Sequence, residues 1–178
     1  LVGSEMCIRD RARHVLESIN LGDQFRVINE EAVQLALKAR DNAADDEVWI
    51  AGSISSMAPF NNEQEVAVGE SVKSNYREMA EILAESGVDL LILEMMRETV
   101  NSILVIEAAL STGLPVWIGY SAMMADDGKN VITWRWKNVK SKPPTGDFEE
   151  LVKETVNLGG DAAGIMHSQV MDLSLIHI

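Results

Sequence analysis

Four short polar segments each follow an apolar stretch of the sequence, and their side chains are the ones that could do chemistry. They are Gly52-Ser53, Glu94, Tyr120-Ser121 and His167-Ser168. Glu94 follows the apolar run from Leu90 to Leu93, where a carboxylate is costly to bury unless it meets a cation. The position therefore suits binding of a ligand ammonium group. Pairing with Arg97 and capping of the following helix are its two alternative roles.

The other candidates each have a functional and a plainer interpretation. His167 could be a metal ligand or an acid/base group, although a lone histidine in a loop is more often a polar surface residue. Gly52 could let a ligand approach the backbone, or it could form an ordinary tight turn, and Ser53 follows it as a second candidate binding residue. His14 lies in a helix that we expect to be exposed, and it is assigned no role. The segment Trp134-Arg135-Trp136 could be a binding platform or part of a hairpin with Val131 and Ile132.

The elements that would position these residues show a regular rhythm. Helix-like stretches end in glycine and lead directly into apolar, β-rich stretches, which is typical of parallel β/α units with buried strands. We expect strands over residues 47–52, 88–93, 114–119 and 161–166. A helix is expected over residues 30–40 with Asn29 as its N-cap, and another is indicated by an apolar stripe at Val72, Tyr76, Met79, Ala80 and Leu83. In such folds the chemistry lies at the carboxyl ends of the strands, and the four polar segments would converge there if the strands close into a barrel.

Composition restricts the class of partner. The chain has 178 residues, of which 47% are hydrophobic, and its 28 acidic against 15 basic residues give a net charge of −13. This acidity argues against nucleic acid as a partner, and no apolar run approaches the roughly 20 residues of a membrane span. A small molecule is the expected partner. With one cysteine in the chain, a disulfide scaffold is excluded.

The two ends of the sequence are unusual. Codons for Glu5 to Asp10, extended by two bases, contain the reverse complement of codons for Leu173 to Ile178. The shared string is that of a transposase adapter from short-read library preparation. We therefore expect residues 1–10 and 173–178 to be adapter-derived and residues 11–172 to be genuine.

Several stretches together resemble the homocysteine S-methyltransferase family, which includes the betaine-homocysteine methyltransferases. The segment 48–54 resembles the family's Ala-Gly-Ser-Ile/Val-Gly-Pro strand, and the segment 76–94 its Tyr-x-x-Gln to Leu-Leu-x-x-Glu-Thr signature. Leu114 to Ile118 resembles the strand that follows. The resemblance spans about residues 14–167. It implies a zinc-dependent barrel of eight β/α units, of which residues 11–172 would be a partial homocysteine-binding domain containing about strands three to six.

The resemblance also implies roles for single residues. Glu94 matches the family glutamate that holds the amino group of homocysteine. His167 stands where the family has the first of three zinc cysteines, so it is a candidate ligand for zinc. In the family, zinc lowers the thiol pKa of homocysteine, and the thiolate then attacks a methyl donor. Ser55-Ser56 replaces the family's Gly-Pro, and Met95 replaces the usual threonine.

The resulting hypothesis is a homocysteine S-methyltransferase of methionine biosynthesis, cytoplasmic, with an unknown methyl donor. Glu94, Gly52 and Ser53 would bind substrate and His167 would bind the metal. We expect the fragment alone to be inactive and prone to aggregation, because a partial barrel leaves strand edges unpaired. The alternatives are a zinc-free barrel enzyme of other chemistry and a non-catalytic barrel that binds an amino acid.

Overall fold

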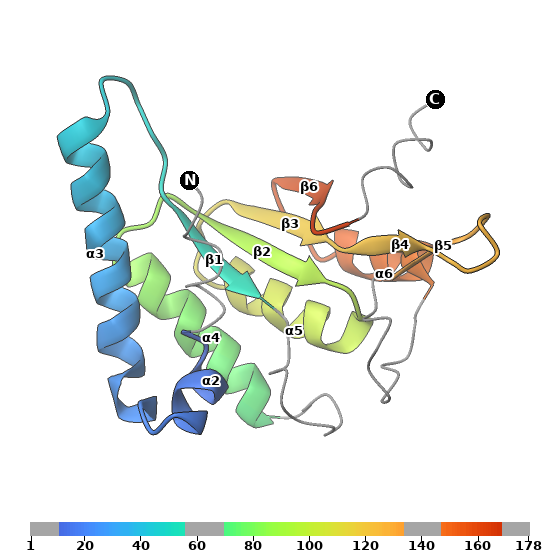
Figure 1. Ribbon diagram of the computed structural model, residues 1–178, viewed down its shortest axis with the longest axis horizontal. Coiled ribbons are helices and arrows are strands. Elements are labelled where there is room, and N and C mark those ends of the chain that lie inside the picture. The colour runs from blue at the N-terminus through green and yellow to red at the C-terminus, as the bar shows by residue number, and fades with distance from the viewer. Residues whose placement is uncertain (1–10, 56–69, 134–146, 169–178) are drawn as a thin grey trace.

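The alternation of helices and parallel strands expected from the sequence is present in the computed structural model. It describes residues 11–55, 70–133 and 147–168 (Figure 1). Four strands form one parallel sheet in the order β1-β2-β3-β6, where β1 is Ala51–Ser55, β2 is Leu90–Met96, β3 is Val116–Tyr120 and β6 is Ala162–Ile165. The chain is thus a mixed α/β protein.

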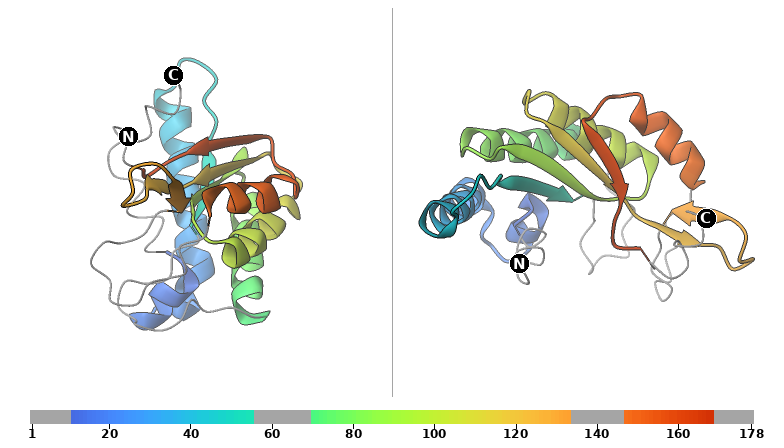
Figure 2. Two further views of the ribbon diagram at one scale, coloured as in Figure 1. Left: turned by 90° about the vertical axis from the view of Figure 1, so that its right-hand side faces the viewer. Right: turned by 90° about the horizontal axis from the view of Figure 1, so that it is seen from above.

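A helix connects each strand to the next in the sheet. These helices are α4 (Glu70–Glu85), α5 (Thr99–Leu110) and α6 (Phe148–Val156), and they lie along one face of the sheet (Figure 2). The expected glycine stops are confirmed at Gly87 and Gly113, which have φ of 98° and 76°, a left-handed conformation that glycine adopts without steric cost.

The core lies between this face and the helices. The sheet contributes alternate residues, which include Leu91, Leu93, Val116 and Ile118, and the helices contribute Ile82, Leu83, Val105, Ile106 and Leu151. Since neighbouring side chains on a strand point to opposite faces, Ser53, Ile92, Glu94 and Trp117 belong to the other face, which we call the site face. Trp117 is 43% exposed there.

Five further elements precede the sheet or extend from it. α2 (Arg13–Ser18), the 3₁₀ turn η1 (Gly22–Gln24) and α3 (Phe25–Ala43) precede β1, and β4 (Ala122–Met124) pairs antiparallel with β5 (Val131–Thr133). This pairing confirms the hairpin interpretation for Val131 and Ile132, whereas Trp134 to Trp136 lie outside the described residues. No helix in the described ranges has the length and apolar character needed to cross a membrane.

Several expected element boundaries are wrong. The second strand ends at Met96 rather than Leu93, so Glu94 lies within β2 and does not follow it. Asn29 is not an N-cap: α3 begins at Phe25, and Asn29 is fully buried inside it, where its amide donates to the carbonyl oxygens of Phe25 and Arg11. The helix begins earlier because the buried Phe25 ring anchors its first turn. The first strand begins at Ala51 rather than Glu47, because Trp49 is exposed and pairing with β2 starts only beyond it.

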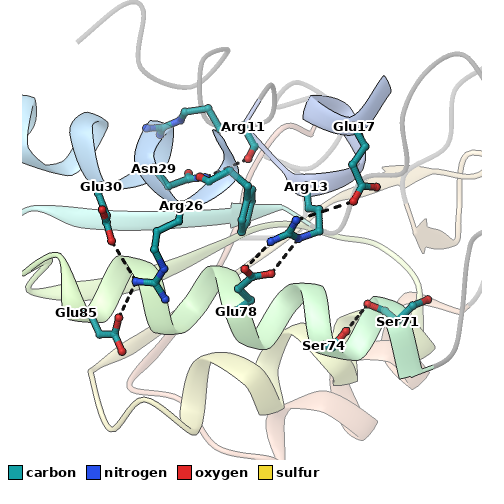
Figure 3. Close-up of polar contacts among 11 residues, drawn as sticks. Arg11, Arg13, Glu17, Arg26, Asn29, Glu30, Ser71, Ser74, Glu78 and Glu85 are labelled. Atoms are coloured by element: carbon teal, nitrogen blue, oxygen red, sulfur yellow. Dashed lines mark hydrogen bonds and ion pairs between the residues drawn. The ribbon is translucent and has the colours of Figure 1, made fainter. Parts of the chain in front are cut away.

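Polar contacts connect α2 and α3 to α4 (Figure 3). Arg13 donates to Glu78 with its Nε 2.9 Å from the carboxylate, and its guanidinium also lies 4.4 Å from the centre of the Phe25 ring. Arg26 of α3 donates to Glu85 at 2.9 Å. Because exposed ion pairs contribute little to stability, these contacts orient the two helices while burial of Phe25 holds them in place.

An aspartate just before β2 and another just before β6 each form two hydrogen bonds to a residue at or just before the start of the neighbouring strand. The Asp89 carboxylate accepts from the Ile50 amide at 2.7 Å, while its own amide donates to the Ile50 carbonyl. Asp161 makes the same two bonds with Val116, each 2.8 Å long. Both aspartates therefore define the register at the amino end of the sheet.

Replacing Asp89 by alanine is expected to lower the free energy of unfolding by about 1–3 kcal/mol, because a charge-assisted bond to a backbone amide is lost. Urea denaturation of the intact protein measures this. Asp45→Ala removes an exposed carboxylate before β1 and serves as the control, with little expected change. Equal stability of the two variants would contradict the fastening role.

His14 differs from expectation, because it is partly buried in α2 rather than exposed. Burial lowers its pKa below the ordinary 6.5, and Glu17 opposes that shift. Below pH 6.5 the unfolded chain therefore binds more protons than the folded one, and the stability contributed by neutral His14 is lost as the pH falls from 6.5 through the lowered pKa.

Replacement of His14 by glutamine should therefore remove part of the acid sensitivity. Between about pH 7.5 and about pH 5.5, the free energy of unfolding should fall less in the variant than in the unmodified protein. Urea denaturation at both pH values compares the two proteins directly. Parallel losses would show that His14 makes no pH-dependent contribution.

Candidate active site

Glu94 lies near the carboxyl end of β2 on the site face, opposite Ser55 of β1. It is buried, with 6% of its surface exposed, although the side chain is formally charged. The backbone around it is irregular. Leu93 pairs with Ile118, but Met96 pairs with Tyr120, so β2 contains one extra residue at this point. This β-bulge ends the regular alternation of side chains directly at Glu94.

Met95, in the bulge, has a φ of 63°, a left-handed conformation that is unfavourable for a side chain of its size. His167, just after β6, also has a positive φ, of 47°. Such residues persist only where the surrounding contacts hold them, and they are concentrated at functional sites. Both flank the carboxyl edge of the sheet.

The fold brings two of the predicted site residues together. The Nε2 atom of His167 lies 3.8 Å from the Oε2 atom of Glu94, although 73 residues separate them in the sequence. The distance permits an ion pair when the imidazole is protonated, but it is longer than a hydrogen bond. The His167 side chain is 38% exposed against 7% for Glu94, so the imidazole lies on the solvent side of the carboxylate.

The capping role considered for Glu94 is filled by another residue. Glu98 is the N-cap of α5, and its carboxylate accepts from the amides of Val100 and Asn101 at 3.1 and 2.6 Å. Arg97 lies near that helix end: burial lowers its pKa, and the negative charge of Glu98 opposes that shift. Glu94 therefore does not cap α5, and it lies on the site face beside His167.

Gly52 and Ser53 lie on opposite faces of β1. A Cβ atom at Gly52 would come within 3.1–3.2 Å of side-chain atoms of Leu91, Leu83 and Val88, so close packing against the helix layer explains the glycine. Ser53 lies on the site face and is 4% exposed. Its hydroxyl is buried without a hydrogen-bond partner in the described part of the chain, which makes it a candidate for contact with a ligand.

Tyr120 and Ser121 also contact different parts of the structure, as Gly52 and Ser53 do. The Tyr120 hydroxyl bonds to Thr155 of α6 at 2.7 Å, and its ring packs edge-on against Phe148, so Tyr120 belongs to the helix layer. Burial raises its pKa, and the bond to Thr155 opposes that shift. Ser121 is fully buried, and its Oγ contacts residues next to both Glu94 and His167. The sequence showed only that a serine follows the strand.

The described residues do not form a complete metal site. No group of three or more histidine, cysteine, aspartate or glutamate side chains lies close enough together within them to hold a metal ion. Glu94 and His167 offer two donors, whereas a catalytic zinc site uses three protein ligands. A metal bound at His167 would need ligands from beyond the described ranges.

A parallel β/α sheet with polar residues gathered at the carboxyl ends of its strands is the usual arrangement of an α/β enzyme. The sequence matches the family described as homocysteine S-methyltransferase over residues 10–144. The chain belongs to this family of methyltransferases. Gly52, Ser53 and Glu94 lie within the matched region, and His167 lies beyond it. Comparison with curated proteins gives no match.

Proposed function

We propose that this chain forms part of the homocysteine pocket of an S-methyltransferase, with Glu94 binding the substrate ammonium group. The observation that carries the proposal is the buried carboxylate of Glu94 at the end of a parallel strand, inside the region that matches the family. A buried carboxylate is stabilised when a cation meets it, and an amino acid supplies one.

Ser53 completes the proposed amino-acid site from the neighbouring strand. Its buried hydroxyl lies on the same face as Glu94, and Ser53 and Glu94 pair with Ile92 and Ser55 across β1 and β2. A polar substrate group would give that hydroxyl its missing partner. Gly52 contributes indirectly, since its close packing against α4 determines the position of Ser53.

We further propose that the sheet is about half of an eight-stranded β/α barrel. Supporting this, all four strands are parallel, they follow chain order, and their helices lie on one face (Figure 2). Trp117 and Ile92 would then face the barrel interior. Residues 11–172 would be a partial domain, inactive when isolated, in a cytoplasmic enzyme of methionine biosynthesis.

Binding of L-homocysteine to the intact protein tests the proposed function. Titration calorimetry should show binding of L-homocysteine and at least tenfold weaker binding of γ-mercaptobutyrate, which keeps the thiol and carboxylate but lacks the amino group. Incubation with common methyl donors should then yield methionine. Binding without transfer from any donor would favour the non-catalytic alternative, and equal affinity for the two thiols would rule out the ammonium site.

Zinc is proposed with His167 as one ligand. Metal analysis of the intact protein should find bound zinc, and His167→Ala should lower the zinc content per chain, since each ligand contributes to affinity. A protein purified without zinc, or a variant with undiminished zinc, would favour the zinc-free alternative. The absence of a group of three or more possible metal ligands among the described residues supports the zinc-free alternative.

A further inference from the structure

The residues next to Glu94 and His167 are connected through one buried hydroxyl. Ser121 follows β3 directly and is fully buried. Its Oγ lies 3.0 Å from the carbonyl oxygen of Met166, the residue before His167. The same Oγ lies 3.5 Å from the sulfur of Met95, the residue after Glu94. A hydroxyl has one proton to donate, and a carbonyl oxygen is a stronger acceptor than a thioether sulfur. The bond to Met166 is therefore the stronger of the two contacts, and the contact with Met95 is the weaker.

A second serine holds the other side of His167. The amide of Ala122 donates to the Ser168 hydroxyl at 2.9 Å, and that hydroxyl donates to the Met166 carbonyl at 2.9 Å. The amide of Met166 donates to the Tyr120 carbonyl. Met166 is therefore bound to the end of β3 and Ser168 to the start of β4, and β3 lies between β2 and β6 in the sheet.

The contacts of Ser121 involve residues at or next to two unfavourable left-handed backbone conformations. Met95 and His167 are two of the three non-glycine residues with positive φ in the described ranges, and Ser121 touches a neighbour of His167 and Met95 itself. A left-handed conformation at such residues is maintained by surrounding contacts. Removal of the hydroxyl would loosen both conformations together.

Resting on the proposed function, we propose that Ser121 is a positioning residue for the amino-acid site. Its hydroxyl fixes the bulge that aims the Glu94 carboxylate and the turn that places the His167 imidazole 3.8 Å from it. Ser121 itself touches no substrate. Its removal should therefore affect recognition of the substrate ammonium group more than binding of the rest of the molecule.

Ser121→Ala in the intact protein tests this by calorimetry with two ligands. The Kd for L-homocysteine should rise roughly 3- to 15-fold, while the Kd for γ-mercaptobutyrate stays within about twofold, because only the former meets Glu94. Ser121→Cys, which keeps a weaker donor at similar volume, should give an intermediate Kd in the presence of a non-thiol reductant, and it decides the matter if the alanine variant does not fold.

Thr155→Val is the matched control. It removes another fully buried hydroxyl, the partner of Tyr120 on the helix side of the sheet, and should leave the ratio of the two Kd values unchanged. An equal rise in both Kd values for Ser121→Ala, or no rise in either, would overturn the positioning role while leaving the ammonium site intact. If the unmodified protein already binds the two ligands equally, the proposed function fails, and the positioning role fails with it.

Discussion

Changing Glu94 to glutamine is expected to weaken binding of L-homocysteine by roughly 30-fold to several thousand-fold. The carboxylate is 6% exposed, so a substrate ammonium group would meet it largely shielded from water. Loss of one partner from such a buried charge pair costs about 2–5 kcal/mol. Calorimetry with the intact protein measures the loss, and kcat/KM for methyl transfer should fall by a similar factor.

Two comparisons make this result specific. γ-Mercaptobutyrate should bind the Glu94→Gln variant nearly as well as the unmodified protein, because it has no ammonium group to lose. Glu107→Gln removes a partly exposed carboxylate from α5, outside the site, and should alter neither affinity. A Glu94→Gln variant that keeps full affinity for homocysteine would assign the ammonium site to another residue.

Gly119→Ala is expected to have the largest effect on the fold around the site. Gly119 lies in β3 opposite the bulge of β2, and a Cβ atom there would come within 2.2 Å of the Met166 sulfur and 2.8 Å of the Leu93 carbonyl oxygen. The methionine side chain can move, but the carbonyl belongs to the backbone that leads into Glu94. Overpacking of this kind costs about 1–3 kcal/mol in the free energy of unfolding.

The sheet supplies an unusually close control for this substitution. Gly164 of β6 pairs directly with Gly119, and a Cβ atom at Gly164 would have no neighbour within 4 Å. Gly164→Ala should therefore leave stability nearly unchanged, whereas Gly119→Ala should lower both the urea midpoint and the affinity for homocysteine. Equal behaviour of the two variants would show that Met166 and the bulge adapt without cost.

The rhythm of glycine stops and apolar runs was sufficient to predict a parallel α/β sheet, because the end of each helix and the apolar strand after it depend on local sequence. The expectation that both strand faces are buried is wrong for β6, which is exposed along its length, and for Trp117 of β3, which is 43% exposed. Convergence of the four polar segments was expected if the strands close into a barrel, and the structure brings two of them, Glu94 and His167, to within 3.8 Å. The resemblance to the family, based on the segments 48–54, 76–94 and 114–118 together, is confirmed by the match over residues 10–144. Closure into a barrel stays a prediction.

What the sequence did not reveal depends on contacts between distant segments. The bulge at Met95 forms where a strand residue takes a left-handed conformation. A run of apolar residues gives no sequence signal for such a conformation. Asn29 resembled a helix cap because asparagine usually serves there, but tertiary packing extended the helix past it. The role proposed for Ser121 depends on its contacts with Met95 and Met166, which are 26 and 45 residues away.

The order of the strands in the sheet has a consequence for how the protein is made. Within the sheet β1-β2-β3-β6, each strand after β1 lies beside the sheet strand synthesised before it, and Asp89 and Asp161 bind β2 and β6 to those neighbours at their first residues. The sheet strand made last therefore has a free edge with which the next sheet strand can pair as it leaves the ribosome. β2, β3 and β6 each find a strand of this sheet already made, so these β/α units can fold one at a time during translation.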